Sequence, residues 1–176
     1  MKRYVIVGNG TAAVGCIEGI RSVDQTGEIT VVSEEQHPVY SRPLISYYLE
    51  NKTDLTRMKY RGDGFYEENG CRVLYGRRAV AADPAKKCVT LDDGAVLPYD
   101  RLCAATGSRP FVPPFEGLAS VRRQYTFMTL DDALAPGENG TMQKCELCLE
   151  NTCGAPACVT GCPNRAIVYE ERSDEA

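Results

Sequence analysis

Short apolar runs and one amphipathic segment dominate the start of the chain. Residues 3–8 (RYVIVG) form a continuous apolar run that ends in glycine, and residues 28–33 (EITVVS) are rich in β-branched side chains. Both patterns predict strands, the first of them a buried parallel one. Between them, residues 11–22 place Ala13, Ile17 and Ile20 on one helical face. A strand, a helix and a strand within about 30 residues predict a right-handed βαβ unit.

The pattern from residue 37 to residue 107 predicts further elements of both kinds. They are a short helix that begins at Pro43, a helix over 62–70 that closes at Gly70, strands over 71–75 and 78–80, a hairpin over 86–98 and a buried strand over 100–107. Within the hairpin, Asp92-Asp93-Gly94 places glycine where a positive φ is needed. The sequence therefore predicts an α/β fold.

A change of composition near residue 135 divides the chain. The stretch APGENGTM over 135–142 has the composition of a linker. With 176 residues, the chain is long enough for one well-buried core and a small appendage. We therefore expect a domain over 1–134, a linker over 135–142 and a separate segment over 143–176.

Charge and hydropathy exclude several classes of partner. The net charge is −4 with no basic stripe, which argues against a nucleic-acid partner. No apolar run approaches the roughly 20 residues that span a bilayer, and the start of the chain lacks the features of a signal peptide. We therefore expect a cytoplasmic protein, in which nine cysteines are metal ligands or buried thiols rather than disulfides. Four of them, Cys16, Cys71, Cys88 and Cys103, are interpreted as buried structural thiols.

A glycine-rich turn follows the first predicted strand. Gly8, Gly10 and Ala13 fit the pattern G-x-G-x-x-G/A, in which the first glycine allows a tight turn and the second lets the backbone approach a diphosphate. The N–H groups at the helix start would then face the phosphates. Glu34 and Glu35 end the second strand, where an acid is expected to bind a ribose. A dinucleotide site is favoured over a purely structural turn.

Three stretches of the chain form a recognisable set: VIVGNGTAAVGCIEGIR, ITVVSEEQHPVYSRPLISYYL and YDRLCAATGSRPFVPPFEG. Together they resemble the FAD-binding part of the pyridine nucleotide–disulfide oxidoreductase superfamily. The branch they resemble contains the NADH-dependent rubredoxin reductases and the flavin part of assimilatory nitrite reductases. The resemblance covers residues 1 to about 133 and implies a Rossmann-like FAD-binding domain. It implies these cofactor-binding residues: Gly8, Gly10, Thr11 and Ala12 for the diphosphate, Glu35 with Glu34 as the alternative for the ribose, Arg42 and Pro43 beside the flavin and diphosphate, Ala81 after the strand at 78–80 for adenine, and Ala105, Thr106 and Gly107 along a second contact strand.

Two features of the resemblance are missing from the sequence. The helix RPLISYYLEN lacks the redox cysteine that disulfide reductases of this superfamily carry, so we expect no thiol–disulfide chemistry at the flavin. Complete members continue after the segment that matches TFMTLDDAL with a nicotinamide domain and later a glycine–aspartate motif, and neither appears here. We therefore expect NAD(P)H to take part only if a partner supplies its site.

Five cysteines lie in the last part of the chain. Their spacing, Cys145-x₂-Cys148-x₄-Cys153-x₄-Cys158-x₃-Cys162-Pro163, resembles half of a ferredoxin-like electron-transfer subunit. The resemblance implies a [4Fe-4S] cluster on Cys145, Cys148, Cys158 and Cys162. Three alternatives stay open: Cys153 completes a single site, Cys162 serves it directly, or the second half lies on another chain. Structural zinc competes, but the C-x₃-C-P ending favours iron–sulfur.

These features together predict a redox protein. The first hypothesis is an FAD-dependent oxidoreductase of the NAD(P)H type that passes electrons between flavin and a [4Fe-4S] cluster. It would work within a larger complex, with a protein electron donor or acceptor. No catalytic side chain is assigned, because flavin–cluster transfer requires the two centres to be close rather than an acid or base. The alternatives are a non-enzymatic electron-transfer or assembly subunit without flavin, and a truncated gene remnant.

Overall fold

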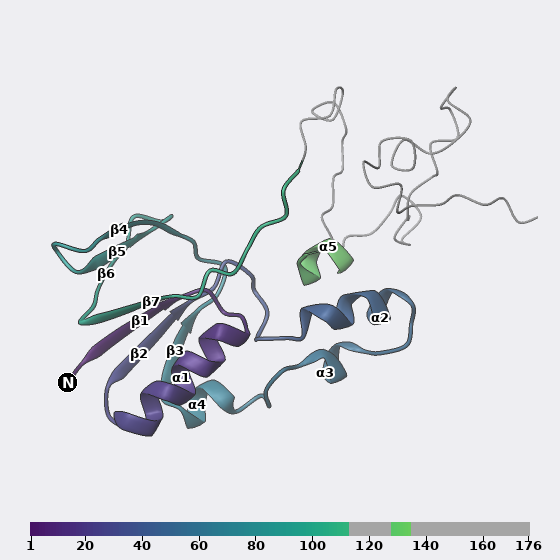
Figure 1. Ribbon diagram of the computed structural model, residues 1–176, viewed down its shortest axis with the longest axis horizontal. Coiled ribbons are helices and arrows are strands. Elements are labelled where there is room, and N and C mark those ends of the chain that lie inside the picture. Colours follow the sequence, from purple (N-terminus) through teal and green to yellow (C-terminus); the bar gives the residue numbers. More distant parts are fainter. Residues whose placement is uncertain (113–127, 135–176) are drawn as a thin grey trace, which may run out of the picture. The chain divides into compact units, whose positions relative to one another are not determined.

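The computed structural model describes residues 1–112 and 128–134, which belong to one unit over Met1–Leu134 (Figure 1). The predicted linker over 135–142 and the predicted cluster segment over 143–176 lie outside the described residues, so both remain predictions.

A four-stranded parallel sheet forms the centre of this unit. Its strands are β1 (Arg3–Val7), β2 (Glu28–Val32), β3 (Cys71–Leu74) and β7 (Arg101–Ala104), in the order β3-β2-β1-β7. All three strand pairs are parallel, with Tyr4 opposite both Ile29 of β2 and Arg101 of β7. Helix α1 (Thr11–Val23) connects β1 to β2, as the apolar pattern predicts. The described residues therefore have the expected α/β, Rossmann-like fold.

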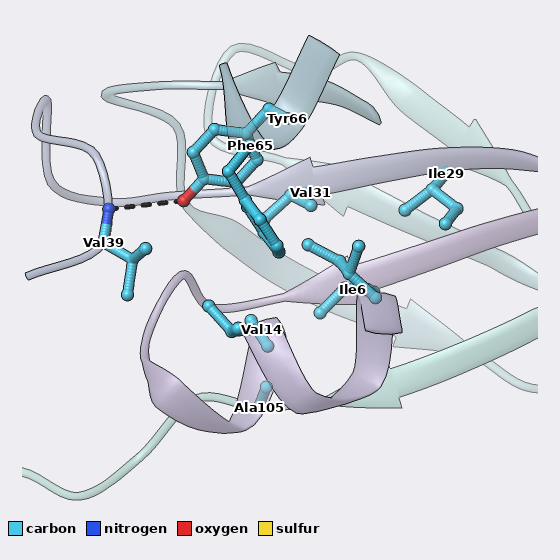
Figure 2. Close-up of a cluster of buried hydrophobic side chains, with 10 residues drawn as sticks. Ile6, Val14, Ile29, Val31, Val39, Phe65, Tyr66 and Ala105 are labelled. Atoms are coloured by element: carbon cyan, nitrogen blue, oxygen red, sulfur yellow. Dashed lines mark hydrogen bonds between the residues drawn. The ribbon is translucent and has the colours of Figure 1, made fainter. Parts of the chain in front are cut away.

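Alternation along the strands explains how both faces of this sheet are buried. In β1, Tyr4 and Ile6 pack in one apolar cluster, whereas Val5 and Val7 pack in another. The first cluster joins the sheet to α1 and to α4 (Phe65–Glu68), and Figure 2 shows several of its side chains. The second joins it to a three-stranded antiparallel sheet. Because side chains of a strand alternate between faces, one parallel strand contributes to both layers.

The antiparallel sheet contains the predicted hairpin. It is built from β4 (Ala79–Asp83), β5 (Cys88–Leu91) and β6 (Val96–Pro98) in that order. Gly94 in the turn has a φ of +83°, and its N–H donates to the Leu91 carbonyl at 3.0 Å. The strand expected over 78–80 extends to Asp83, so the placement of Ala81 after that strand was wrong.

Short helices occupy the segment between β2 and β3. They are the 3-10 helix η1 (Arg42–Leu44), α2 (Ile45–Leu49), α3 (Leu55–Met58) and α4, and a further helix, α5 (Leu130–Leu134), follows later in the chain. The helix expected over 62–70 forms only over Phe65–Glu68. Gly70 has a φ of +55° and ends this region, as expected of a glycine after a helix.

The four cysteines of the described unit are free thiols that are less buried than expected. Each is partly exposed. Cys16, Cys71 and Cys103 pack against the first apolar cluster from its edge. Burial, followed by a hydrogen bond with Cys103, raises the pKa of Cys16 to about 11.

Candidate dinucleotide-binding site

The first glycine of the turn is held against the end of β7. Gly8 donates its N–H to the Val32 carbonyl at 2.9 Å and has a φ of +109°. A Cβ atom placed on Gly8 would lie 2.1 Å from the carbonyl oxygen of Ala105. Ala105 is in turn fixed by its N–H, which donates to the Val7 carbonyl at 2.8 Å. Only glycine fits at position 8, for a reason of packing as well as of φ.

The second glycine has open space beside it. Gly10 is the N-cap residue of α1, and a Cβ there would meet no atom within 4 Å. No side chain caps this helix, and its first turn holds no acidic residue. Thr11 and Ala12 are exposed, whereas Ala13 is fully buried against the sheet. The first amides of a helix lack intrahelical acceptors, so this end suits an anionic group such as a diphosphate.

The two acids that follow β2 have different surroundings. Glu35 is held on both carboxylate oxygens: Oε2 accepts from the Tyr40 hydroxyl at 2.6 Å, and Oε1 accepts from the Arg42 guanidinium at 2.7 Å. Its side chain is only 18% exposed. Glu34 is 60% exposed and pairs with Arg109 at 2.9 Å. Glu35 is therefore the more fixed of the two carboxylates.

Arg42 lies in η1 together with Pro43, where it forms the ion pair with Glu35. The structure thus brings together two residues that the sequence assigns to the same ligand. The Arg42 side chain is 44% exposed, yet it is held by this ion pair.

The remaining candidates divide between the two sheets. Ala105 is buried beside Gly8, and the exposed residues Thr106 and Gly107 follow it, with a φ of +67° at Gly107. These three residues follow β7 directly, as Gly8 follows β1 and Glu34 follows β2 after one residue. The carboxyl ends of parallel strands are where ligands bind in such sheets. Ala81 differs, because it lies inside β4 and pairs with Thr90 in the antiparallel sheet.

A buried tyrosine connects the glycine-rich turn to the segment after β2. The Tyr66 hydroxyl donates to Asn9 Oδ1 at 2.7 Å and accepts from the Val39 N–H at 3.3 Å, and Figure 2 shows the second bond. Asn9 also donates to the His37 carbonyl at 3.4 Å. Burial is the main reason that the pKa of Tyr66 is raised. Sequence reasoning missed this contact, for which the only signal is the asparagine between two glycines.

A second missed tyrosine contacts the carboxylate itself. The Tyr40 hydroxyl, besides donating to Glu35, accepts from the Leu130 N–H of α5 at 2.8 Å. Burial, with the Glu35 contact next, raises the pKa of Tyr40 far above its usual range. His37 lies nearby with its Nε2 2.8 Å from Asp131 of α5. The loop that carries the candidate site is therefore attached to α5 at two points.

Comparison with known proteins identifies the family. Residues 2–146 match the family model of the pyridine nucleotide-disulphide oxidoreductases. The chain belongs to this family. It is 38% identical to the nitrite reductase [NAD(P)H] of Bacillus subtilis, over 66% of the chain and 14% of that relative. It is 35% identical to the NADH-dependent phenylglyoxylate dehydrogenase subunit epsilon of Aromatoleum evansii, over 75% of the chain and 31% of the relative.

Solved structures of this family support the fold. The crystal structure of the ferredoxin reductase for the CYP199A2 system from Rhodopseudomonas palustris matches with a TM-score of 0.67 and 25% identity, over 76% of this chain and 33% of that one. The chain thus spans about a third or less of the proteins it resembles. Membership of the pyridine nucleotide-disulphide oxidoreductase family relates the chain to flavin-dependent oxidoreductases of the NAD(P)H type, and it implies FAD binding. The open, uncapped start of α1 fits such a group.

Two further findings concern the described residues only. Over residues 1–112 and 128–134, no three His, Cys, Asp or Glu side chains gather as a metal site. The five cysteines assigned to a cluster lie elsewhere in the chain, at 145–162. In the same described part of the chain, no helix has the length and apolar character to cross a membrane.

Proposed function

We propose that residues 1–134 bind FAD through its ADP part, at the carboxyl edge of the parallel sheet. The observation that carries the proposal is the start of α1, where an uncapped helix begins at a glycine with open space beside it. In this assignment the diphosphate contacts Gly8, Gly10, Thr11 and Ala12, with Ala105, Thr106 and Gly107 along the neighbouring strand end. Glu35, rather than Glu34, accepts the ribose hydroxyls, and Arg42 and Pro43 lie beside the diphosphate.

The contacts of Glu35 and Arg42 refine this assignment. A carboxylate has about four lone-pair sites, of which Tyr40 and Arg42 use one on each oxygen. Ribose hydroxyls therefore have acceptor sites left on Glu35. The proposed adenine contact with Ala81 has less support, because that residue lies in the antiparallel sheet.

The electron-transfer part of the proposal rests on the cysteines of the segment over 143–176. Bound FAD supplies hydride acceptance and release of single electrons, and the protein's task is to hold it near the next carrier. We assign that carrier to a [4Fe-4S] cluster on four of Cys145, Cys148, Cys153, Cys158 and Cys162. A relative named as a dehydrogenase subunit and another named as a ferredoxin reductase support a protein partner for this chain. NAD(P)H would enter at a site on such a partner.

Substitution of Gly10 tests the FAD site. Because a Cβ at position 10 meets no protein atom, Gly10→Ala is expected to fold normally while obstructing the approach of a diphosphate. Equilibrium titration of the 176-residue chain with FAD, and separately with ADP, should show at least about a tenfold loss of affinity for both. Gly19→Ala is the matched control, since Gly19 lies in α1 with equally open space. Equal binding by parent and Gly10→Ala, or no binding of FAD by the parent, contradicts the proposal.

Metal and sulfide analysis of anaerobically purified protein tests the tail. The proposal expects about four irons and four sulfides per chain, together with flavin absorbance. Cys145→Ser should remove the iron and leave FAD binding unchanged, because the two sites use different residues. Iron without flavin would favour the non-enzymatic electron-transfer subunit instead. Zinc without iron would overturn the cluster assignment.

A further inference from the structure

We infer that Tyr40 is a positioning residue that fixes the Glu35 carboxylate for ribose binding and links it to α5. This inference rests on the proposed function, since it concerns how the adenosine end of the dinucleotide is held. It adds a residue and a coupling that the family resemblance does not contain. The evidence is a chain of two hydrogen bonds through one hydroxyl.

The hydroxyl of Tyr40 is used in both directions. A phenolic O–H has one donor and also accepts. The donor points to Glu35 Oε2 at 2.6 Å, and the oxygen accepts the Leu130 N–H at 2.8 Å. The direction of the first bond is fixed, because a backbone amide occupies the acceptor side and a carboxylate offers no proton at neutral pH. The contact therefore holds one oxygen of Glu35 while Arg42 holds the other.

The start of α5 depends on the same Tyr40 hydroxyl. Asp132 Oδ2 accepts from the N–H groups of Met128 and Thr129, and the Asp132 N–H donates to Thr129 Oγ1. These contacts cap the start of α5 but do not include the Leu130 N–H. Tyr40 provides the acceptor for that amide at a residue that is 6% exposed. An amide at this depth needs a partner, so α5 and Tyr40 hold each other in place.

A second contact makes the attachment specific to this loop. His37 Nε2 lies 2.8 Å from Asp131 Oδ1, one residue after Leu130 in α5. Both His37 and Tyr40 belong to the loop that starts with Glu34 and Glu35. A displacement of α5 would thus change the position of the loop at two points. We expect that the Glu35 carboxylate would then be less fixed in position. The protein would in consequence show a weaker preference for a ribose with free hydroxyls over one that lacks them.

Ligands that differ only in those hydroxyls isolate this role. The probes are ADP and 2′,3′-dideoxy-ADP, titrated into the 176-residue chain. The parent should prefer ADP. In Tyr40→Phe, which keeps the ring and removes the hydroxyl, the preference should fall about threefold to tenfold. Affinity for dideoxy-ADP should not change. Glu35→Gln gives the reference for a damaged carboxylate, and Tyr47→Phe, at a tyrosine that is 52% exposed, is the control.

Variants at Leu130 test the link to α5. Proline is tolerated at the first position of a helix but has no N–H, so Leu130→Pro removes the donor to Tyr40. Leu130→Ala removes the same side chain and keeps the donor. The ADP preference should fall in Leu130→Pro and stay at the parental value in Leu130→Ala. Equal preferences in these two variants would overturn the coupling.

The outcomes separate this inference from the proposed function. An equal loss for both ligands in Tyr40→Phe would mean that the hydroxyl only supports the fold, which overturns the inference. An unchanged preference in Tyr40→Phe, with the parent still preferring ADP, overturns it as well and leaves the FAD proposal intact. If the parent binds neither ADP nor dideoxy-ADP, the proposed function fails and this inference fails with it.

Discussion

Substitution of Gly8 by alanine should destabilise the protein through a specific backbone collision. Gly8 has a φ of +109°, a conformation that costs a residue with a Cβ about 1–3 kcal/mol. The new Cβ would also lie 2.1 Å from the Ala105 oxygen and 2.6 Å from its carbonyl carbon. Because both atoms belong to the backbone, no side-chain rotation relieves the contact. Overpacking of this kind costs about 1–3 kcal/mol.

The two terms together predict a loss of about 2–6 kcal/mol from the free energy of unfolding. Domains of this size have about 5–15 kcal/mol in total, so the variant should fold with a clearly reduced denaturation midpoint. Gly94→Ala provides the control. Gly94 has a φ of +83°, but a Cβ there meets no atom within 4 Å. It should therefore show the conformational cost without the collision.

Urea denaturation followed by circular dichroism, without added ligand, measures both variants against the parent. The midpoint should fall in the order parent, Gly94→Ala, Gly8→Ala, with similar m-values. The difference between the two variants estimates the cost of the contact with Ala105. If Gly8→Ala is no less stable than Gly94→Ala, the close approach of the turn to the end of β7 is not as described, and the packing argument for glycine at this position is refuted.

Two further predictions concern groups that sequence reasoning treated as structural or overlooked. Tyr66→Phe should lower the free energy of unfolding by about 1–3 kcal/mol, because Asn9 Oδ1 loses its donor and the Val39 N–H loses its acceptor. Tyr47→Phe, at an exposed ring, should not, and equal urea midpoints for the two variants would contradict this. Cys16 has its pKa raised to about 11 by burial and by Cys103, so the stability it contributes is complete below the pKa of the unfolded thiol and is lost as pH rises toward 11. Unfolding titrations from pH 8 to 11 should show a steeper decline for the parent than for Cys16→Ala, and parallel curves would refute this.

The elements that were predicted correctly are those whose sequence patterns lie within one short stretch of the chain. β1 follows from a continuous apolar run, β2 follows from β-branched residues, and the turn at Gly94 follows from its residue types. The glycine pattern also singled out Gly8 and Gly10, where a Cβ would meet the Ala105 backbone and no atom within 4 Å, respectively. Their role in binding a diphosphate stays a prediction. Local patterns carry this information because pleating, helical periodicity and positive φ are properties of short segments.

The errors arose where tertiary contacts decide the outcome. β4 continues through Ala81 and Ala82, which have weak strand preference, because β5 pairs with them, so Ala81 lies inside a strand. The contacts of Tyr66 with Asn9 and of Tyr40 with Leu130 join residues 57 and 90 positions apart. No local pattern reports which hydroxyl meets which amide over such distances. The tail assignments stay predictions, because they fall on residues that the structure does not describe.

The position of β7 beside β1 has a consequence for biosynthesis. Arg3 is the first residue of β1, and Asp100 directly precedes β7. The two residues are 97 positions apart and are joined by a hydrogen bond of 2.8 Å from the Arg3 N–H to the Asp100 carboxylate. At about 5–20 residues per second, a ribosome adds that length in about 5–20 s. During this interval β1, α1 and β2 have been synthesised, but β7 and Ala105, which packs against Gly8, have not. We expect ribosome-bound chains to be captured by immobilised ADP only when they are long enough to expose β7, and capture of shorter nascent chains would show that the turn forms without it.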